Sequence, residues 1–181
     1  GDTDGGGQQM FYIKGNETYG SMYGHTWVKS LDQMSKQLPA GKTIADYEVN
    51  SRGFVIAKGT QGMITERAIK QLDDKGAILF GKIGDGNADF NMGFANTLNF
   101  KRATFYFLLD LKKGGDIYNA KGQWLTRDLR NPEMDMGGVA QGDKKAYDYF
   151  LNFYDVNTPN SYWVEDGTYL KLREVALGYT F

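Results

Sequence analysis

The most apolar stretch of the chain, residues 99–111 (NFKRATFYFLLDL), alternates between two kinds of side chain. Successive side chains of a β-strand point to opposite faces, so this alternation predicts a strand with one wholly apolar face. Such a face requires an apolar environment, which is either a protein core or the hydrocarbon of a membrane. The apolar positions are Ala103, Phe105, Phe107, Leu109 and Leu111, and the positions between them are Thr104, Tyr106, Leu108 and Asp110.

A hairpin with one short and one long connection is predicted around this strand. Residues 89–100 and 103–113 are expected to pair as antiparallel strands, with Lys101 and Arg102 at the turn. Residues 114–167 then form a long irregular excursion. Loops of this length are uncommon in compact domains, whereas outer-membrane barrels combine short turns at one end with long loops at the other. This asymmetry is typical of strands that cross a membrane, but soluble sandwiches and barrels also contain alternating strands, and the pattern alone favours the soluble alternative.

The last predicted strand, residues 168–181, also has two unlike faces. A face of small residues suits a crowded or polar lumen, and aromatic residues near a strand end suit a membrane interface. About 9–11 residues of a tilted strand cross the hydrocarbon layer, and residues 103–111 and 173–181 meet this length. The large side chains are Val175, Leu177, Tyr179 and Phe181, and between them lie Ala176, Gly178 and Thr180.

Shorter elements are predicted in the rest of the chain. Capping signals and periodicity predict helices at residues 30–42, capped by Ser30, and at residues 64–76, capped by Thr65. Helical spacing also recurs within residues 143–155. Short strands are predicted at 10–16, 18–30, 47–59 and 76–84, and in the second of these Tyr19, Tyr23 and Trp27 should share one face.

Composition excludes several classes of function. The net charge is −1 and there is no basic run, so nucleic acid is not an expected partner. The chain has no cysteine, which excludes disulfides and thiolate chemistry. No run approaches the roughly 18 apolar residues of a membrane helix, which leaves strands as the possible crossing elements. The polar, glycine-rich residues 1–9 are not a secretion signal, and both ends are expected to continue in a longer protein.

The residues that could carry chemistry do not form a recognisable constellation. Asp85, Asn87 and Asp89 alternate like calcium ligands, but the glycine and glutamate that an EF-hand loop needs at its sixth and twelfth positions are missing, which predicts a turn. His25 is the only histidine, so a structural or lumenal role is expected rather than a zinc site. We predict no catalytic residues, no metal and no cofactor, and therefore no enzyme activity.

Aromatic residues are frequent in the long excursion. Aromatic rings with a polar edge stack on sugars and also anchor protein interfaces. The alternative is that they pack the excursion against its own neighbours or against the interfacial belt of a membrane. The candidates for contact with a substrate are Trp124, Tyr147, Tyr149, Tyr154 and Trp163.

Three stretches carry more specific patterns: residues 19–30 (YGSMYGHTWVKS), 83–120 (IGDGNADFNMGFANTLNFKRATFYFLLDLKKGGDIYNA) and 162–181 (YWVEDGTYLKLREVALGYTF). In order and spacing they resemble the SusC/RagA family, which are TonB-dependent outer-membrane transporters of Bacteroidetes-type bacteria. Two departures concern the external region. Gly86 and Ala88 replace the prolines usual in the family, and its common acidic loop is absent, which leaves the cargo open.

The resemblance implies an all-β fold, with antiparallel strands of a transmembrane β-barrel and long external loops that contain short helices. Residues 1–181 would be a segment of the barrel domain, without the plug and the last strands, and residues 114–167 would be a long external loop. The lipid-facing residues would then be Phe105, Phe107, Leu109, Leu111, Val175, Leu177 and Tyr179.

The resemblance also implies a function and partners in the cell outer membrane. A transporter of this kind imports oligosaccharides, or in some members peptides, as part of nutrient uptake. It works with a SusD-like surface lipoprotein, with TonB through the plug region, with the rest of the barrel and with outer-membrane lipid. The alternative is a soluble all-β surface module that binds glycans, in which Phe105 and Phe107 lie in a core. An enzyme such as a glycoside hydrolase is a third possibility, and it requires two carboxylates that meet in one cleft.

Overall fold

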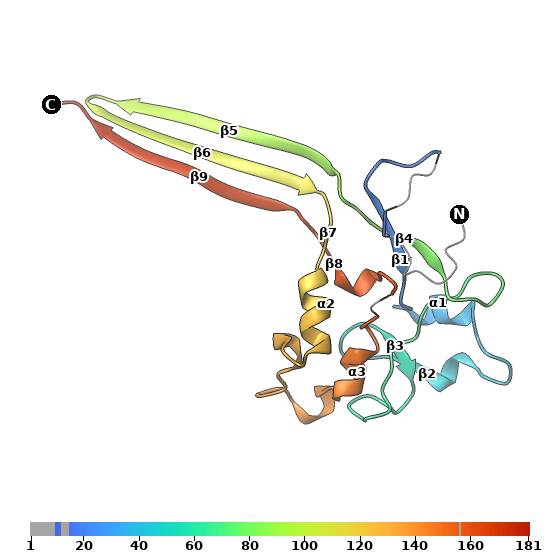
Figure 1. The fold of residues 1–181 in the computed structure, drawn as a ribbon. Coiled ribbons are helices and arrows are strands. Elements are labelled where there is room, and N and C mark those ends of the chain that lie inside the picture. Colours follow the sequence, from blue (N-terminus) through green and yellow to red (C-terminus); the bar gives the residue numbers. More distant parts are fainter. Residues whose placement is uncertain (1–9, 12–14, 156) are drawn as a thin grey trace.

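A computed structural model describes residues 10–11, 15–155 and 157–181, and they form two parts (Figure 1). The first part, which we call the arm, is a long three-stranded sheet. The second part, the lobe, comprises the other described residues. The strands are β1 (Ser21–His25), β2 (Tyr47–Val49), β3 (Val55–Ala57), β4 (Phe80–Asp85), β5 (Ala88–Phe100), β6 (Ala103–Gly114), β7 (Ile117–Tyr118), β8 (Val164–Glu165) and β9 (Tyr169–Tyr179).

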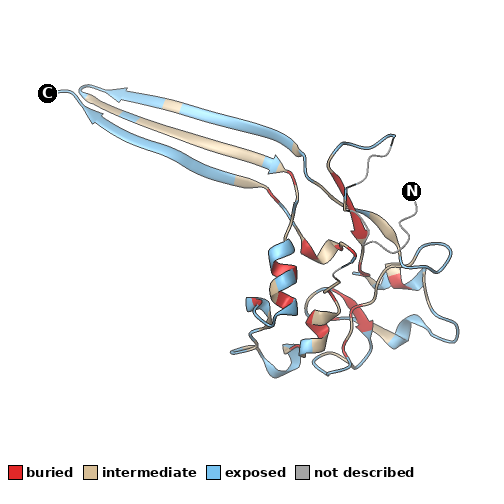
Figure 2. Ribbon diagram, in the orientation of Figure 1, coloured by how far each residue is buried: buried red, intermediate tan, exposed pale blue. Residues whose placement is uncertain are grey.

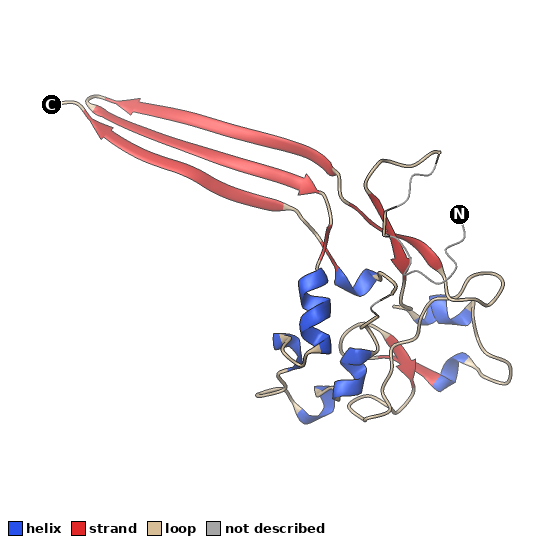
Figure 3. Ribbon diagram, in the orientation of Figure 1, coloured by secondary structure: helices blue, strands red, loops and turns tan. Residues whose placement is uncertain are grey.

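Helices occur in the lobe and are short (Figure 3). All the strand pairs in the described residues are antiparallel, which agrees with the all-β expectation. The α-helices are α1 (Leu31–Ser35), α2 (Ala120–Arg127) and α3 (Tyr147–Leu151), and the 3-10 helices are η1 (Ile44–Asp46), η2 (Pro132–Met134), η3 (Gln141–Asp143) and η4 (Ser161–Trp163).

The arm has the strand order β5-β6-β9. The predicted hairpin is confirmed, because Phe100 pairs with Ala103 and only Lys101 and Arg102 lie between them. Lys101 adopts φ 53, the left-handed conformation that two-residue hairpin turns favour. Strand β9 pairs along the other edge of β6, with a bulge opposite Leu108 and Leu109.

The lobe has an aromatic core that joins segments far apart in the sequence. Trp27 and Phe54 from the first half pack with Phe153 from the second half, and the ring centroids of Trp27 and Phe153 are 4.7 Å apart. The described residues from 115 to 167 therefore contribute to the core of the lobe and contain short helices. A smaller cluster of Val28, Met34 and Val55 extends the core.

The prediction of a helix at residues 64–76 is wrong, because this segment contains no helix. Glu66 is fully buried and forms an ion pair with Lys145, with 2.8 Å between Oε1 and Nζ. The main chain then runs extended, because the Ile69 N–H donates to the Val55 carbonyl and the Ile69 carbonyl accepts from Val28 N–H. These long-range contacts outweigh the modest helix preference of the segment.

Other predicted elements are shorter than their patterns. Helix α1 begins after Ser30, whose hydroxyl accepts from the Gln33 N–H as predicted, and it ends at Ser35. Tyr23 and Trp27 are buried, but Tyr19 is 81% exposed and does not share their surroundings.

Predicted strand ranges also change. The range 47–59 is a small hairpin of β2 and β3, and the range 76–84 contains β4, which starts at Phe80. The predicted helical spacing in 143–155 corresponds to α3. Residues 12–14, the centre of the strand predicted at 10–16, lie outside the described residues.

Candidate functional site

One face of the arm is apolar along nearly its whole length. The register places the large side chains of all three strands on this face, so that Phe105 lies between Leu98 and Leu177, and Leu111 lies between Met92 and Leu170. The predicted lipid-facing residues of β6 and β9 all belong to it. We call it the apolar face, and its members are Met92, Phe94, Leu98, Phe100, Phe105, Phe107, Leu109, Leu111, Leu170, Leu172, Val175, Leu177 and Tyr179.

No described residue of the lobe covers the apolar face, which lies open along the projecting sheet (Figure 2). Leu177 is 78% exposed, Phe100 73% and Leu98 56%. Phe107, Leu109 and Leu111 are half-buried because β6 is the central strand and side chains of both neighbours flank them. Phe107 contacts Phe94 and Phe105, with ring centroids 5.9 and 5.8 Å apart.

Apart from Leu108, the opposite face of the arm carries polar or small side chains. Thr104 lies between Asn99 and Gly178, and Tyr106 lies between Thr97 and Ala176. Towards the lobe, this face becomes charged. There the Arg173 guanidinium donates to Asp110 Oδ2, with 2.6 Å from Nη2, and the Tyr169 hydroxyl donates to the same oxygen.

The length of the arm fits a tilted crossing of a bilayer. At about 3.4 Å per residue, the 12 residues of β6 extend about 40 Å. A strand tilted by about 40° then rises about 30 Å, which is the thickness of the hydrocarbon layer. Among the described residues there is no helix with the length and hydropathy needed to span a membrane.

Asn96 interrupts the apolar face. It lies opposite Phe107, and its Oδ1 is buried without a hydrogen-bond partner among the described residues. Strand β5 is an edge strand of the arm, so the main-chain N–H and C=O groups on its outer side have no partner strand among the described residues. Sequence periodicity gave no signal for this residue.

A tight joint connects the arm to the lobe where the ends of β6 and β9 enter it. A Cβ on Gly167 would lie 1.9 Å from the carbonyl oxygen of Gly115, so no other residue fits there without a shift of the main chain. Asp116 also joins the segment after β6 to the end of β4, because its carboxylate accepts a hydrogen bond of 2.9 Å from the Asp85 N–H. Gly115 belongs to the GGDIYN stretch and Gly167 to the VEDG stretch. The close approach of their main chains explains why each stretch has a glycine at that position.

The turn predicted at residues 85–89 begins as an Asx turn. The Asn87 N–H donates to Asp85 Oδ1 at 3.0 Å. Hydrogen bonds from the Thr18 hydroxyl, this N–H and the Lys82 ammonium hold the pKa of Asp85 well below its usual range. The carboxylate is thus charged and engaged by protein donors.

His25 lies at the end of β1 and packs edge-on against Phe80, with ring centroids 6.2 Å apart. Burial and the neighbouring Lys70 ammonium lower the pKa of His25, and Asp155 opposes them. The neutral imidazole is therefore the favoured form, and its contacts are those of a packing residue.

The aromatic candidates for substrate contact separate into two groups. Tyr149 and Trp163 are fully or almost fully buried in the aromatic core, so they are corrected to core residues. Burial raises the pKa of Tyr149 to about 12. Trp124 and Tyr147 are 44% and 42% exposed, and Tyr154 is half-buried. The Arg127 guanidinium covers one face of the Trp124 ring at 4.3 Å.

A buried polar network holds the two halves of the lobe together. The Lys145 ammonium donates to both carboxylate oxygens of Glu66, and both side chains are fully buried. The Asn50 amide donates to Glu66 and to the Tyr149 hydroxyl. The pair is separated by 79 residues in the sequence, and no local pattern could have indicated it.

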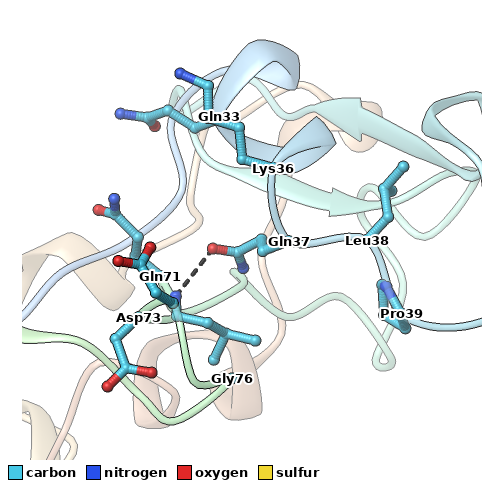
Figure 4. Close-up of a pocket in the computed structure, with 10 residues that line it drawn as sticks. Gln33, Lys36, Gln37, Leu38, Pro39, Gln71, Asp73 and Gly76 are labelled. Atoms are coloured by element: carbon cyan, nitrogen blue, oxygen red, sulfur yellow. Dashed lines mark hydrogen bonds between the residues drawn. The ribbon is translucent and has the colours of Figure 1, made fainter.

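A large hollow in the lobe has a volume of about 740 Å³ and lies between α1 and residues 71–76 (Figure 4). Two of its polar side chains, Gln37 and Asp73, are already hydrogen-bonded within the protein. The Gln37 amide donates to the Lys70 carbonyl and accepts from the Leu72 N–H, and Asp73 accepts from two N–H groups of its own turn. Gln37 thus connects the segment after α1 to residues 70–72 along this hollow.

A smaller hollow, of about 390 Å³, was not anticipated from the sequence. It is lined by Lys29, Arg52, Phe54, Glu133, Ser161, Tyr162 and Val164. Its residues come from four separate segments, so only the fold brings them together.

No protein-family model matches this chain, and a search of curated proteins finds no significant match. The resemblance seen in the sequence therefore rests on the residues themselves.

Proposed function

We propose that this chain forms wall strands and the external part of a SusC-like, TonB-dependent importer in the outer membrane. The observation that carries the proposal is the uncovered apolar face of β5, β6 and β9, opposite a face of small and polar residues. The resemblance of residues 83–120 and 162–181 to the SusC/RagA family adds the class of transporter.

The apolar area on the arm is too large for an ordinary soluble surface. An aromatic side chain has about 150–250 Å² of surface, and Phe94, Phe100, Phe105 and Tyr179 are each 37–73% exposed. These four rings alone expose roughly 400 Å², which already equals the largest patch of a typical soluble monomer, about 300–600 Å². The aliphatic side chains of the face add to it. Lipid is the solvent in which such a face is stable.

In the proposed arrangement, the arm crosses the bilayer with the Lys101–Arg102 turn on the periplasmic side. The lobe stands on the outer side, next to a SusD-like lipoprotein and the cargo. Neighbouring strands of the barrel pair with the free edges of β5 and β9, because unpaired main-chain groups are costly in hydrocarbon. Oligosaccharide or peptide cargo passes when TonB displaces a plug domain.

A matched pair of substitutions tests the orientation of the arm. Phe107 and Tyr106 are adjacent, similar in size and close to the middle of β6, but they point to opposite faces. An arginine on the lipid side near the bilayer midplane costs about 2–4 kcal/mol. We expect Phe107→Arg to abolish heat-modifiable barrel assembly of the full-length protein in its own cells, whereas Tyr106→Arg retains assembly. Equal assembly of the two variants would contradict the proposal.

The lobe favours a second candidate, a surface-binding module. It has its own aromatic core, as a self-sufficient domain requires. In that case the whole chain remains monomeric in buffer without detergent and unfolds in one sharp transition. Aggregation that detergent reverses favours the membrane assignment.

A further inference from the structure

We propose that the smaller hollow of the lobe, which we call the Lys29–Arg52 pocket, binds a small ligand that carries one carboxylate next to an apolar or ring-shaped group. The proposal depends on this pocket alone and holds whichever environment the arm occupies. Its volume of about 390 Å³ lies in the range of small-molecule sites, about 300–1,000 Å³.

The Arg52 guanidinium is held in the pocket by several neighbouring side chains. Arg52 donates to the Glu133 carboxylate and to the Tyr162 hydroxyl, each at 3.3 Å, and stacks on the Phe150 ring at 5.0 Å. Glu133 also accepts a hydrogen bond of 2.6 Å from the Tyr162 hydroxyl. Glu133 and Arg52 thus neutralise each other, and the positions of their side chains are set before any ligand arrives.

Lys29 supplies the uncompensated charge. It is exposed and lines the pocket, and its ammonium lies 5.9 Å from the centre of the Phe54 ring. Among the described residues, it forms no salt bridge. The three ionised side chains of the pocket therefore leave a surplus of one positive charge, which matches one carboxylate. A phosphate dianion fits less well because it approaches the Glu133 carboxylate.

Aromatic rings supply the rest of the surface. Tyr162 stacks on Phe153 with ring centroids 3.9 Å apart and lies 5.9 Å from Phe54, so the two rings of the pocket are fixed by the core. Rigid rings beside cations suit the apolar face of a sugar or a hydrophobic side chain next to a carboxylate. A uronic acid and the C-terminal residue of a peptide share this chemistry.

Two acids and their neutral counterparts distinguish these sources. With the full chain in detergent micelles, saturation-transfer NMR compares D-glucuronate with D-glucose, and N-acetylphenylalanine with its amide. We expect at least one acid to bind, and to bind at least about tenfold more tightly than its neutral partner. Equal binding of acid and neutral partner, or binding of neither acid, would overturn the proposal.

Variants locate the interaction at Lys29. Lys29→Met removes the charge and keeps the aliphatic stem, and we expect it to weaken binding of the acid at least about tenfold. Lys29→Arg restores binding. The control is Lys36→Met, which removes an exposed lysine beside the larger hollow. If Lys29→Met and Lys36→Met bind the acid equally well, while both melt like the parent chain, the pocket does not act through Lys29 and the proposal fails.

Discussion

The arm and the lobe use the same kinds of apolar side chain in opposite ways. In the lobe, Phe153 is fully buried and contacts aromatic rings from both halves of the chain. In the arm, Leu177 is 78% exposed although it lies in the centre of an apolar surface. The lobe thus buries its apolar side chains against one another, whereas no described residue of the lobe covers the apolar face of the arm.

The largest expected difference between the two parts is the cost of losing an apolar side chain in water. Phe153→Ala should destabilise the lobe by about 3–5 kcal/mol, because it leaves a cavity in a packed core. Leu177→Ala should change stability by less than about 0.5 kcal/mol, because the side chain is already in water.

Urea unfolding followed by tryptophan fluorescence measures this difference. All three tryptophans, Trp27, Trp124 and Trp163, lie in the lobe, so the signal reports its unfolding. A cost for Leu177→Ala that equals the cost for Phe153→Ala would mean that the arm packs on a core of its own, and the contrast between the two parts would be lost.

The buried pair gives a comparable effect by a different cause. Lys145→Met leaves the Glu66 carboxylate buried without its cation, and removing one partner of such a pair costs about 3–5 kcal/mol. Thermal melting measures the loss, with Lys144→Met as the control at a less buried neighbour. The double variant Glu66→Gln, Lys145→Met should recover part of the stability. A wild-type melting temperature for Lys145→Met would show that the pair does not hold the lobe.

The joint between the two parts should respond less strongly. Gly167→Ala places a methyl group against the Gly115 carbonyl, and overpacking of this kind costs about 1–3 kcal/mol. Protease sensitivity near residues 112–118 should rise, because the β7–β8 pair loosens. Gly93→Ala is the control, since a Cβ there meets no atom within 4 Å. Identical proteolysis of the two variants would contradict a tight joint.

The smallest expected effect is a pH dependence of the stability of the lobe, which arises from His25. The pKa of His25 in the folded chain is lower than the ordinary 6.5, chiefly because of burial. The folded state therefore binds fewer protons than the unfolded state, and stability falls as the pH drops below about 6.5. His25→Gln should reduce this slope in urea midpoints measured from pH 8 to pH 5. An unchanged slope would assign the pH dependence to other groups.

Sequence reasoning succeeded where structure follows from local periodicity. The alternation of 103–111 and the short turn at Lys101 gave the hairpin and the faces of the arm, because strand side chains alternate whatever surrounds them. The cap at Ser30 followed from its hydroxyl in the same way.

Prediction from the sequence failed where contacts with distant segments decide the conformation. Residues 64–76 have a helical pattern, but Glu66 pairs with Lys145, and the Ile69 main chain bonds to Val28 and Val55. Neither contact can be read from the neighbouring sequence. The Lys29–Arg52 pocket is assembled from separate segments for the same reason. Tyr149 and Trp163 look like surface aromatics only until the core around them is known.

The environment of the apolar face is the central claim, and spin labels measure it directly. Because the chain has no cysteine, single cysteines at successive positions from 104 to 109 can each carry a nitroxide in the protein reconstituted into lipid vesicles. We predict that oxygen, which concentrates in lipid, reaches positions 105, 107 and 109, and that a water-soluble nickel chelate reaches 104, 106 and 108. If the odd positions are reached by neither reagent, or mainly by the nickel chelate, the apolar face does not contact lipid and the importer assignment is wrong.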